Sequence, residues 1–235
     1  MERFMPLTAS PLFGLMITLL AYQAGVLVHK KLKTPLLGPL VVASGLIILL
    51  LVLTGIPVEN YSVGGSIITF FLGPSVVVLA LPLYRNFRLL KANWIAILSG
   101  ITVGSFAGIL TILVLSFVLD LDGSIMISIL PKSVTTPIGL EITKELGGIS
   151  SITVLSIFTT GLLGAMIYPY VFKVFRIKHP VAKGVALGTA AHALGTAKAV
   201  EIGDQEGAMS GLSIGLAGIV TVFLIPLVLS FLGIS

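Results

Sequence analysis

Residues 93–119 read NWIAILSGITVGSFAGILTILVLSFVL and contain no charged side chain. A helix needs roughly 20 mainly apolar residues to cross a bilayer, so this stretch predicts a transmembrane helix. The rest of the chain has the same character, because 56% of its 235 residues are hydrophobic and only 10% are charged. A soluble domain carries about 25% charged residues. The sequence therefore predicts an all-α integral membrane protein.

Six uncharged stretches are long enough to cross a bilayer. No polar region between them is long enough to fold separately, so residues 1–235 are expected to form a single polytopic membrane domain. The predicted transmembrane stretches are Ser10–Val28, Leu36–Ile56, Tyr61–Tyr84, Asn93–Leu119, Ile149–Phe172 and Ala208–Ile234.

Basic residues are concentrated in three short loops, at residues 30–33, 85–91 and 173–183. Lys and Arg accumulate in cytoplasmic loops, so these loops are expected inside the cell membrane and the amino terminus outside it. The same bias accounts for the net charge of +5, and nucleic-acid binding is not expected. The loops hold ten of the fourteen basic residues: Lys30, Lys31, Lys33, Arg85, Arg88, Lys91, Lys173, Arg176, Lys178 and Lys183.

Several kinds of chemistry are not expected. The chain has no cysteine, which excludes disulfides, thiolate metal sites and cysteine nucleophiles. No metal-ligand spacing, phosphate-binding glycine loop or hydrolytic triad is present in the sequence. We therefore expect neither an enzyme nor a bound metal or cofactor.

Two polar stretches interrupt the apolar pattern. Residues 131–142 read PKSVTTPIGLEI, and residues 188–199 read GTAAHALGTAKA. Irregular backbone at membrane depth survives only where protein buries it or water lines it. We therefore expect two re-entrant or broken helical segments that enter from opposite faces and meet near the middle. The charge pattern leaves open whether residues 181–206 re-enter or cross.

Lys132 stands inside an otherwise uncharged run, Gly123–Leu140. An ammonium group at membrane depth costs a few kcal/mol, and an ionisable residue there is a candidate functional group. The functional interpretation makes Lys132 the cationic partner of a bound carboxylate. The structural alternative is that Lys132 pairs with Glu141 or extends to the outer surface.

Hydroxyl groups surround this lysine in the sequence. Ser133, Thr135 and Thr136 are expected to help bind the carboxylate. If Pro137 opens a half-helix, the free amide protons there add a positive dipole end that suits an anion.

A second set of candidate residues lies in the polar stretch at residues 188–199. His192 and Thr196 are four residues apart and would share a helix face, with Lys198 about half a turn further on. Gly188 and Gly195 permit close approach of a backbone or a ligand. These residues are therefore either a second part of the substrate site, with His192 coupling proton movement, or tight helix packing around a buried histidine.

A glycine–proline pair predicts a further interruption. Gly73-Pro74-Ser75 is expected to kink or break the third stretch, because proline removes an internal hydrogen bond. Short similarities between Leu72-Gly73-Pro74-Ser75 and Leu187-Gly188-Thr189 suggest inverted repeats, which secondary transporters often combine with discontinuous helices. Small-residue helix faces also favour a homodimer.

The strings PKSVTTPIGLEI and GTAAHALGTAKAVEIGDQEGAMSGLSIGLAG, together with FLGPSVVVLALPLYRN at residues 71–86, resemble the hallmark segments of the LrgB/CidB family over nearly the whole chain. The resemblance implies an antiholin-like protein that affects murein hydrolase export and lysis with a small LrgA/CidA-type partner. Related proteins, including a plastid member that fuses both halves, resemble carriers of glycolate, glycerate or pyruvate. The LrgA-like half is missing here.

The sequence thus favours a secondary membrane transporter of small monocarboxylates of the glycolate, glycerate, pyruvate or lactate type. The anion is expected near the midplane, between the two polar segments. The alternative is an antiholin-like regulator of murein hydrolase activity and cell lysis, which acts with a holin-like partner without moving substrate. A passive channel is the third interpretation.

Overall fold

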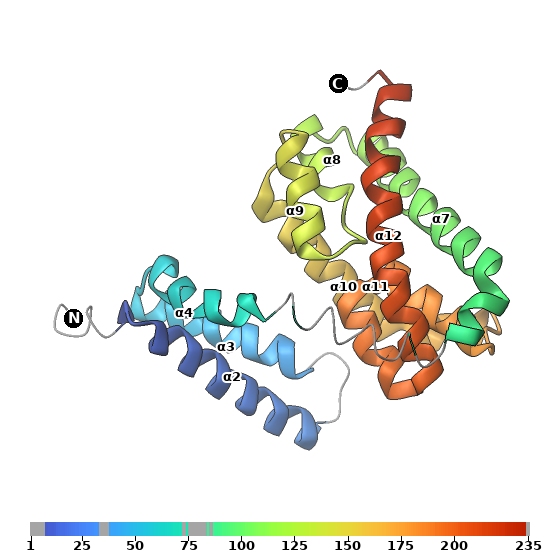
Figure 1. The fold of residues 1–235 in the computed structure, drawn as a ribbon. Coiled ribbons are helices and arrows are strands. Elements are labelled where there is room, and N and C mark those ends of the chain that lie inside the picture. Colours follow the sequence, from blue (N-terminus) through green and yellow to red (C-terminus); the bar gives the residue numbers. More distant parts are fainter. Residues whose placement is uncertain (1–7, 33–37, 72–73, 75–83, 85–86, 234–235) are drawn as a thin grey trace. The chain divides into compact units, whose positions relative to one another are not determined.

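The structure is a computed structural model that describes residues 8–32, 38–71, 74, 84 and 87–233. Within these ranges the chain is helical and contains no strand (Figure 1). It divides into two compact units, Met1–Val78 and Leu79–Ser235. The helices are α2 (Pro11–Leu32), α3 (Pro39–Thr54), α4 (Val58–Phe70), α7 (Phe87–Val118), α8 (Gly123–Ile129), α9 (Thr136–Glu145), α10 (Ser150–Val174), α11 (Pro180–Ile202) and α12 (Asp204–Phe231).

Four described helices are long and apolar enough to cross a membrane, which agrees with an all-α membrane protein. They lie at Pro11–Leu32, Lys91–Val118, Ser150–Val174 and Asp204–Phe231, and each coincides with a predicted transmembrane stretch.

Two of the six predicted stretches correspond to shorter helices. The stretch at 36–56 contains α3, which has 16 residues. In the stretch at 61–84, α4 ends at Phe70. The predicted kink at Gly73-Pro74-Ser75 lies outside the described residues, apart from Pro74.

Close helix crossings hold the first unit together. Gly14 of α2 and Gly64 of α4 face each other so closely that a methyl group on either would collide with the other helix. The hydroxyls of Thr18 and Tyr61 are 2.9 Å apart and form a hydrogen bond across the same pair of helices. Glycine is required here because only a residue without Cβ allows the two backbones to approach.

Two apolar clusters stabilise the second unit. One joins α7, α8, α9 and α12 around Ile109, Leu130 and Ile225. The other joins α7, α11 and α12 around Ile101, Val185 and Met209. α7 contributes to both clusters and, through Gly100, Gly104 and Gly108, also lines a cavity.

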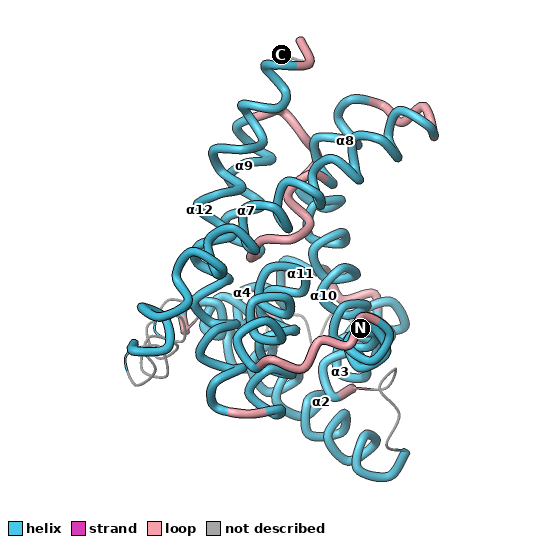
Figure 2. The backbone as a smooth tube through the Cα atoms, turned by 90° about the vertical axis from the view of Figure 1, so that its right-hand side faces the viewer, coloured by secondary structure: helices cyan, strands magenta, loops and turns pink. Residues whose placement is uncertain are grey.

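The first polar stretch is interrupted at residues 130–135 (Figure 2). Asp122 caps the amino end of α8, and its carboxylate accepts a hydrogen bond from the backbone N–H of Ser124 (2.8 Å). α9 begins with a proline at its amino end, as the sequence predicts. The backbone N–H of Ile149 donates to the hydroxyl of Ser128 (2.6 Å). The start of α10 therefore lies beside α8.

The second polar stretch is interrupted at His192, where φ is 40° and ψ is −125°. Beyond it the chain turns back, since a methyl group on Gly195 would collide with the backbone oxygen of Leu187. In a continuous helix these residues would be about 12 Å apart along the axis. Lys183 and Ile202, near the two ends of α11, line the same small hollow. α11 is therefore a hairpin with His192 at its tip.

Candidate functional site

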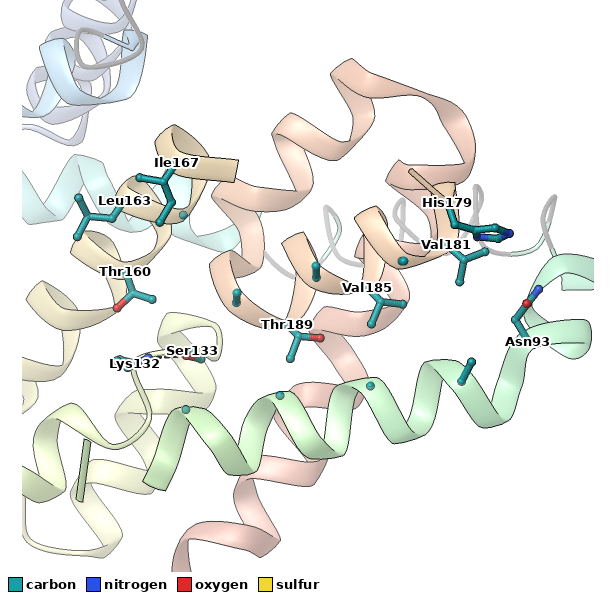
Figure 3. A pocket seen from close by; sticks show the side chains of 18 residues that line it. Asn93, Lys132, Ser133, Thr160, Leu163, Ile167, His179, Val181, Val185 and Thr189 are labelled. Carbon is teal, nitrogen blue, oxygen red and sulfur yellow. Dashed lines mark hydrogen bonds between the residues drawn. The ribbon is translucent and has the colours of Figure 1, made fainter. Parts of the chain in front are cut away.

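A cavity of about 910 Å³ lies in the second unit, between α7, α10, α11 and the turn that joins α8 to α9 (Figure 3). Most of its wall is apolar or glycine, and a few polar groups project from it. Pockets that bind small molecules commonly have this composition. The polar side chains that line the cavity are Asn93, Lys132, Ser133, Thr160, His179 and Thr189.

One wall of the cavity is a row of glycines on α7. Gly100, Gly104 and Gly108 are four residues apart, so they share one face of the helix. A methyl group on Gly104 would lie 3.2 Å from Cγ2 of Thr189, and one on Gly108 would lie 3.9 Å from Nζ of Lys132. The glycines thus provide the space into which the polar side chains project.

Lys132 points into this cavity from the turn between α8 and α9 (Figure 3). Its ammonium group donates a hydrogen bond to the hydroxyl of Ser133 (3.1 Å). Within the described part of the chain, no carboxylate lies within salt-bridge distance of Lys132. The carboxylate of Glu141, the alternative partner, binds Lys144 instead (2.9 Å) at an exposed position. Lys132 is therefore a partly buried basic group with no carboxylate partner among the described residues.

Thr189 projects into the cavity from α11. Only 6% of this residue is exposed, and its hydroxyl has no hydrogen-bond partner among the described residues. An unsatisfied buried hydroxyl costs about 1–3 kcal/mol. Thr189 therefore places an unpartnered hydroxyl beside the cavity that Lys132 also lines. Thr160 adds a second hydroxyl from α10.

His192 does not line the cavity; it lies buried between α10 and α11. Its Nε2 donates a hydrogen bond to the backbone oxygen of Ile157 (2.9 Å). Gly161 makes room for the ring, because a methyl group there would lie 2.5 Å from Cε1 of His192. Thr160 of α10, next to Gly161, lines the cavity together with Lys132. The tips of the two broken segments therefore meet against the same part of α10.

The structure separates the other predicted site residues from the cavity. The hydroxyl of Thr196 bonds to the hydroxyl of Ser210 on α12 (2.7 Å). Lys198 forms a salt bridge with Glu201 (2.9 Å). Thr135 and Thr136, at the start of α9, do not line the cavity.

The predicted glycines of α11 pack against backbone. A methyl group on Gly188 would collide with the backbone oxygen of Ser210 on α12. Gly195 lies against the other arm of its own hairpin. Both glycines thus allow close helix packing, which was one of the two interpretations of this stretch.

The structure therefore brings together Lys132 and Ser133 from the predicted set, and adds Thr160 and Thr189. Thr189 lies inside the quoted string GTAAHALGTAKA, which is a weak signal for this residue. No signal in the sequence points to Thr160, because a threonine in an apolar helix is ordinary. No group of three or more His, Asp or Glu side chains that could hold a metal ion occurs in the described ranges.

Comparison with known proteins agrees with the resemblance seen in the motifs. The model of the LrgB-like family matches residues 18–231. Antiholin-like protein LrgB of Bacillus cereus (strain B4264) is 40% identical over 227 residues, which are 96% of this chain and 99% of that protein. The protein of the same name from Bacillus anthracis (strain CDC 684 / NRRL 3495) gives the same values. No solved structure matches the chain. The chain belongs to the LrgB family.

Proposed function

We propose that this chain has an antiholin-like role in the cell membrane, where it restrains murein hydrolase activity and lysis with an LrgA/CidA-type partner. The shared name of the relatives supports this role most directly, because they are 40% identical to the chain over almost their whole length. The name of a relative does not say by which physical activity the protein acts. The cavity at Lys132 suggests such an activity.

The cavity favours carriage of a small monocarboxylate. The observation that carries this proposal is Lys132, which faces a glycine-walled cavity without a carboxylate partner among the described residues. Charge attraction is strong in a setting of low dielectric constant. A bound carboxylate would pair with the ammonium group of Lys132. Its second oxygen, or a hydroxyl group elsewhere on the substrate, could form a hydrogen bond with the hydroxyl of Thr189.

The path of the chain supports alternating access. The α8–α9 segment precedes the amino end of α10, whereas the α11 hairpin follows its carboxyl end. If α10 crosses the bilayer, the two segments enter from opposite faces and their tips meet beside α10. Discontinuous helices that meet near the midplane are the usual substrate site of secondary transporters. The basic residues that follow α10 orient this end toward the cytoplasm.

Uptake and lysis measured on the same variants separate the two proposals. Purified chain in proteoliposomes, with and without an LrgA/CidA-type partner, should take up labelled glycolate or pyruvate in a saturable manner. In cells, expression of the chain should delay lysis. A variant that loses uptake but still delays lysis would establish regulation without carriage. Flux that neither saturates nor follows a proton gradient would indicate a passive channel.

A further inference from the structure

A second hollow, of about 400 Å³, lies in the same unit where α10 ends and α11 begins. It is separate from the cavity at Lys132, and the two share no lining residue. Four of its eight lining residues are basic, two are aromatic and two are isoleucines. The lining residues are Tyr168, Phe172, Lys173, Arg176, Ile177, Lys178, Lys183 and Ile202.

The basic residues of this hollow have no acidic counterpart. No Asp or Glu lines it, and none of its four cations forms a salt bridge within the described ranges. The positive-inside bias explains why basic residues occur in this loop. It does not explain why four of them surround one hollow.

Arg176 adopts a backbone conformation that disfavours an arginine. It follows α10 with φ at 54°, and the backbone N–H of Ile177 donates to the oxygen of Phe172 (2.9 Å). This is a helix ending in which glycine is the usual residue, because a Cβ is strained at positive φ. An arginine held there at a free-energy cost indicates a use for its side chain.

Lys183 is also placed where its charge is unfavourable. It lies in the first turn of α11, and its backbone N–H donates to the oxygen of His179 (3.1 Å). The amino end of a helix carries a partial positive charge, which repels a cation and attracts an anion. Two of the four cations therefore sit at positions that the local backbone alone does not favour.

The rest of the hollow is suited to a lipid. The rings of Tyr168 and Phe172 pack edge to face, with centroids 5.6 Å apart. Tyrosine is enriched where transmembrane helices leave the bilayer. Such a surface can contact the glycerol and upper acyl carbons of a phospholipid while the cations contact its phosphate.

We propose that this hollow binds the phosphate group of an anionic phospholipid. Basic pockets at the cytoplasmic ends of transmembrane helices are suited to such headgroups. The guanidinium of Arg176 can donate two parallel hydrogen bonds to phosphate oxygens. Inorganic phosphate offers the same kind of oxygen acceptors but cannot use the aromatic surface, which favours the lipid as the source.

The test measures binding of short-chain phosphatidylglycerol, of phosphatidylcholine with the same acyl chains, and of inorganic phosphate to the full chain in detergent. Native mass spectrometry counts the bound molecules. The wild-type chain should prefer phosphatidylglycerol. Because one cation near a membrane surface contributes about a fivefold change in affinity, Arg176→Gly should reduce this preference about fivefold. Lys31→Gln, which removes an exposed cation from the last turn of α2, should leave it unchanged.

Two measurements keep the test independent of folding. Arg176→Gly relieves the positive-φ strain, so the thermal midpoint of the variant should equal or exceed that of the wild type. Lys183→Gln removes a second cation from another helix and should also reduce the preference about fivefold. The proposal is overturned if the wild type binds both lipids equally or if both variants retain its preference. Inorganic phosphate that binds as tightly as phosphatidylglycerol would overturn the lipid as the ligand.

Discussion

The turn between α8 and α9 and the break at His192 in α11 both bring a basic side chain to the middle of the second unit, but they use it differently. Lys132, in the first, bonds to the neighbouring hydroxyl of Ser133, its one partner among the described residues, and faces the cavity. His192, in the second, bonds to the backbone of α10 and fills the space left by Gly161. One group is available to a ligand, whereas the other is committed to packing.

This difference indicates that polarity alone does not identify a binding group in a membrane protein. A buried polar group with its hydrogen bonds satisfied stabilises the fold, whereas one that lacks a partner needs a ligand or water. By this criterion Lys132 and Thr189 are candidates for binding, and His192 and Thr196 are candidates for stability. The following predictions test that division, from the largest expected effect to the smallest.

The largest effect is expected at Lys132. Lys132→Ala removes the cation of the cavity, and a hydrogen bond to a charged group contributes about 1.5–3 kcal/mol. Carboxylate uptake in proteoliposomes should therefore fall more than tenfold, with expression unchanged. Lys144→Ala is the matched control, because Lys144 pairs with Glu141 at the surface. Undiminished uptake by Lys132→Ala would remove this lysine from the site.

His192 should affect stability more than binding. His192→Ala leaves the backbone oxygen of Ile157 without its side-chain donor and should cost about 1–3 kcal/mol of folding free energy. His192→Gly loses the same bond but tolerates φ at 40°, so it should be about 1 kcal/mol more stable than the alanine variant. Thermal unfolding in detergent measures both. Equal stabilities would show that the backbone at His192 is not strained, and loss of substrate binding at full stability would make His192 a ligand.

Thr189 should show opposite effects on binding and stability. Thr189→Val removes an unpartnered buried hydroxyl, so stability should stay equal or rise by about 1 kcal/mol, while carboxylate affinity falls about fivefold. The control is Ser116→Ala, because Ser116 carries the other such hydroxyl in the described residues and does not line the cavity. Unfolding and binding titrations on both variants test the pair. Equal affinities in Thr189→Val and the wild type would assign Thr189 to packing.

The smallest effect concerns the exposed start of the α8–α9 segment. Hydrogen bonds from the side chain and then the backbone of Ser124 hold the pKa of Asp122 below its ordinary value of 3.8. A carboxylate with a lowered pKa in the folded state stabilises the protein above its ordinary pKa and loses this contribution as the pH falls through the lowered value. Asp122→Asn should therefore show a slightly smaller loss of thermal stability on acidification than the wild type. Identical pH profiles would contradict a capping role for this charge.

The sequence by itself determined the membrane class and the places where the helices break. The uncharged stretch at residues 93–119 could only be helical in a bilayer, because every backbone group must bond within its own segment. The prolines at 131 and 137 and the glycine-rich run around His192 predicted the two interruptions. The motifs in these same stretches also identified the family, which the relatives confirm.

Only the tertiary structure decided which polar groups face the cavity. Lys132, His192 and Lys198 are equivalent in sequence, as basic residues within polar runs. Their surroundings distinguish them: a glycine face on α7 for Lys132, a backbone oxygen on α10 for His192, and Glu201 for Lys198. The direction in which α11 returns was likewise undetermined by charge, and the contact between Gly195 and Leu187 fixes it. Hydrogen-bond satisfaction depends on groups brought close in space by folding, and the local pattern of residues does not contain that information.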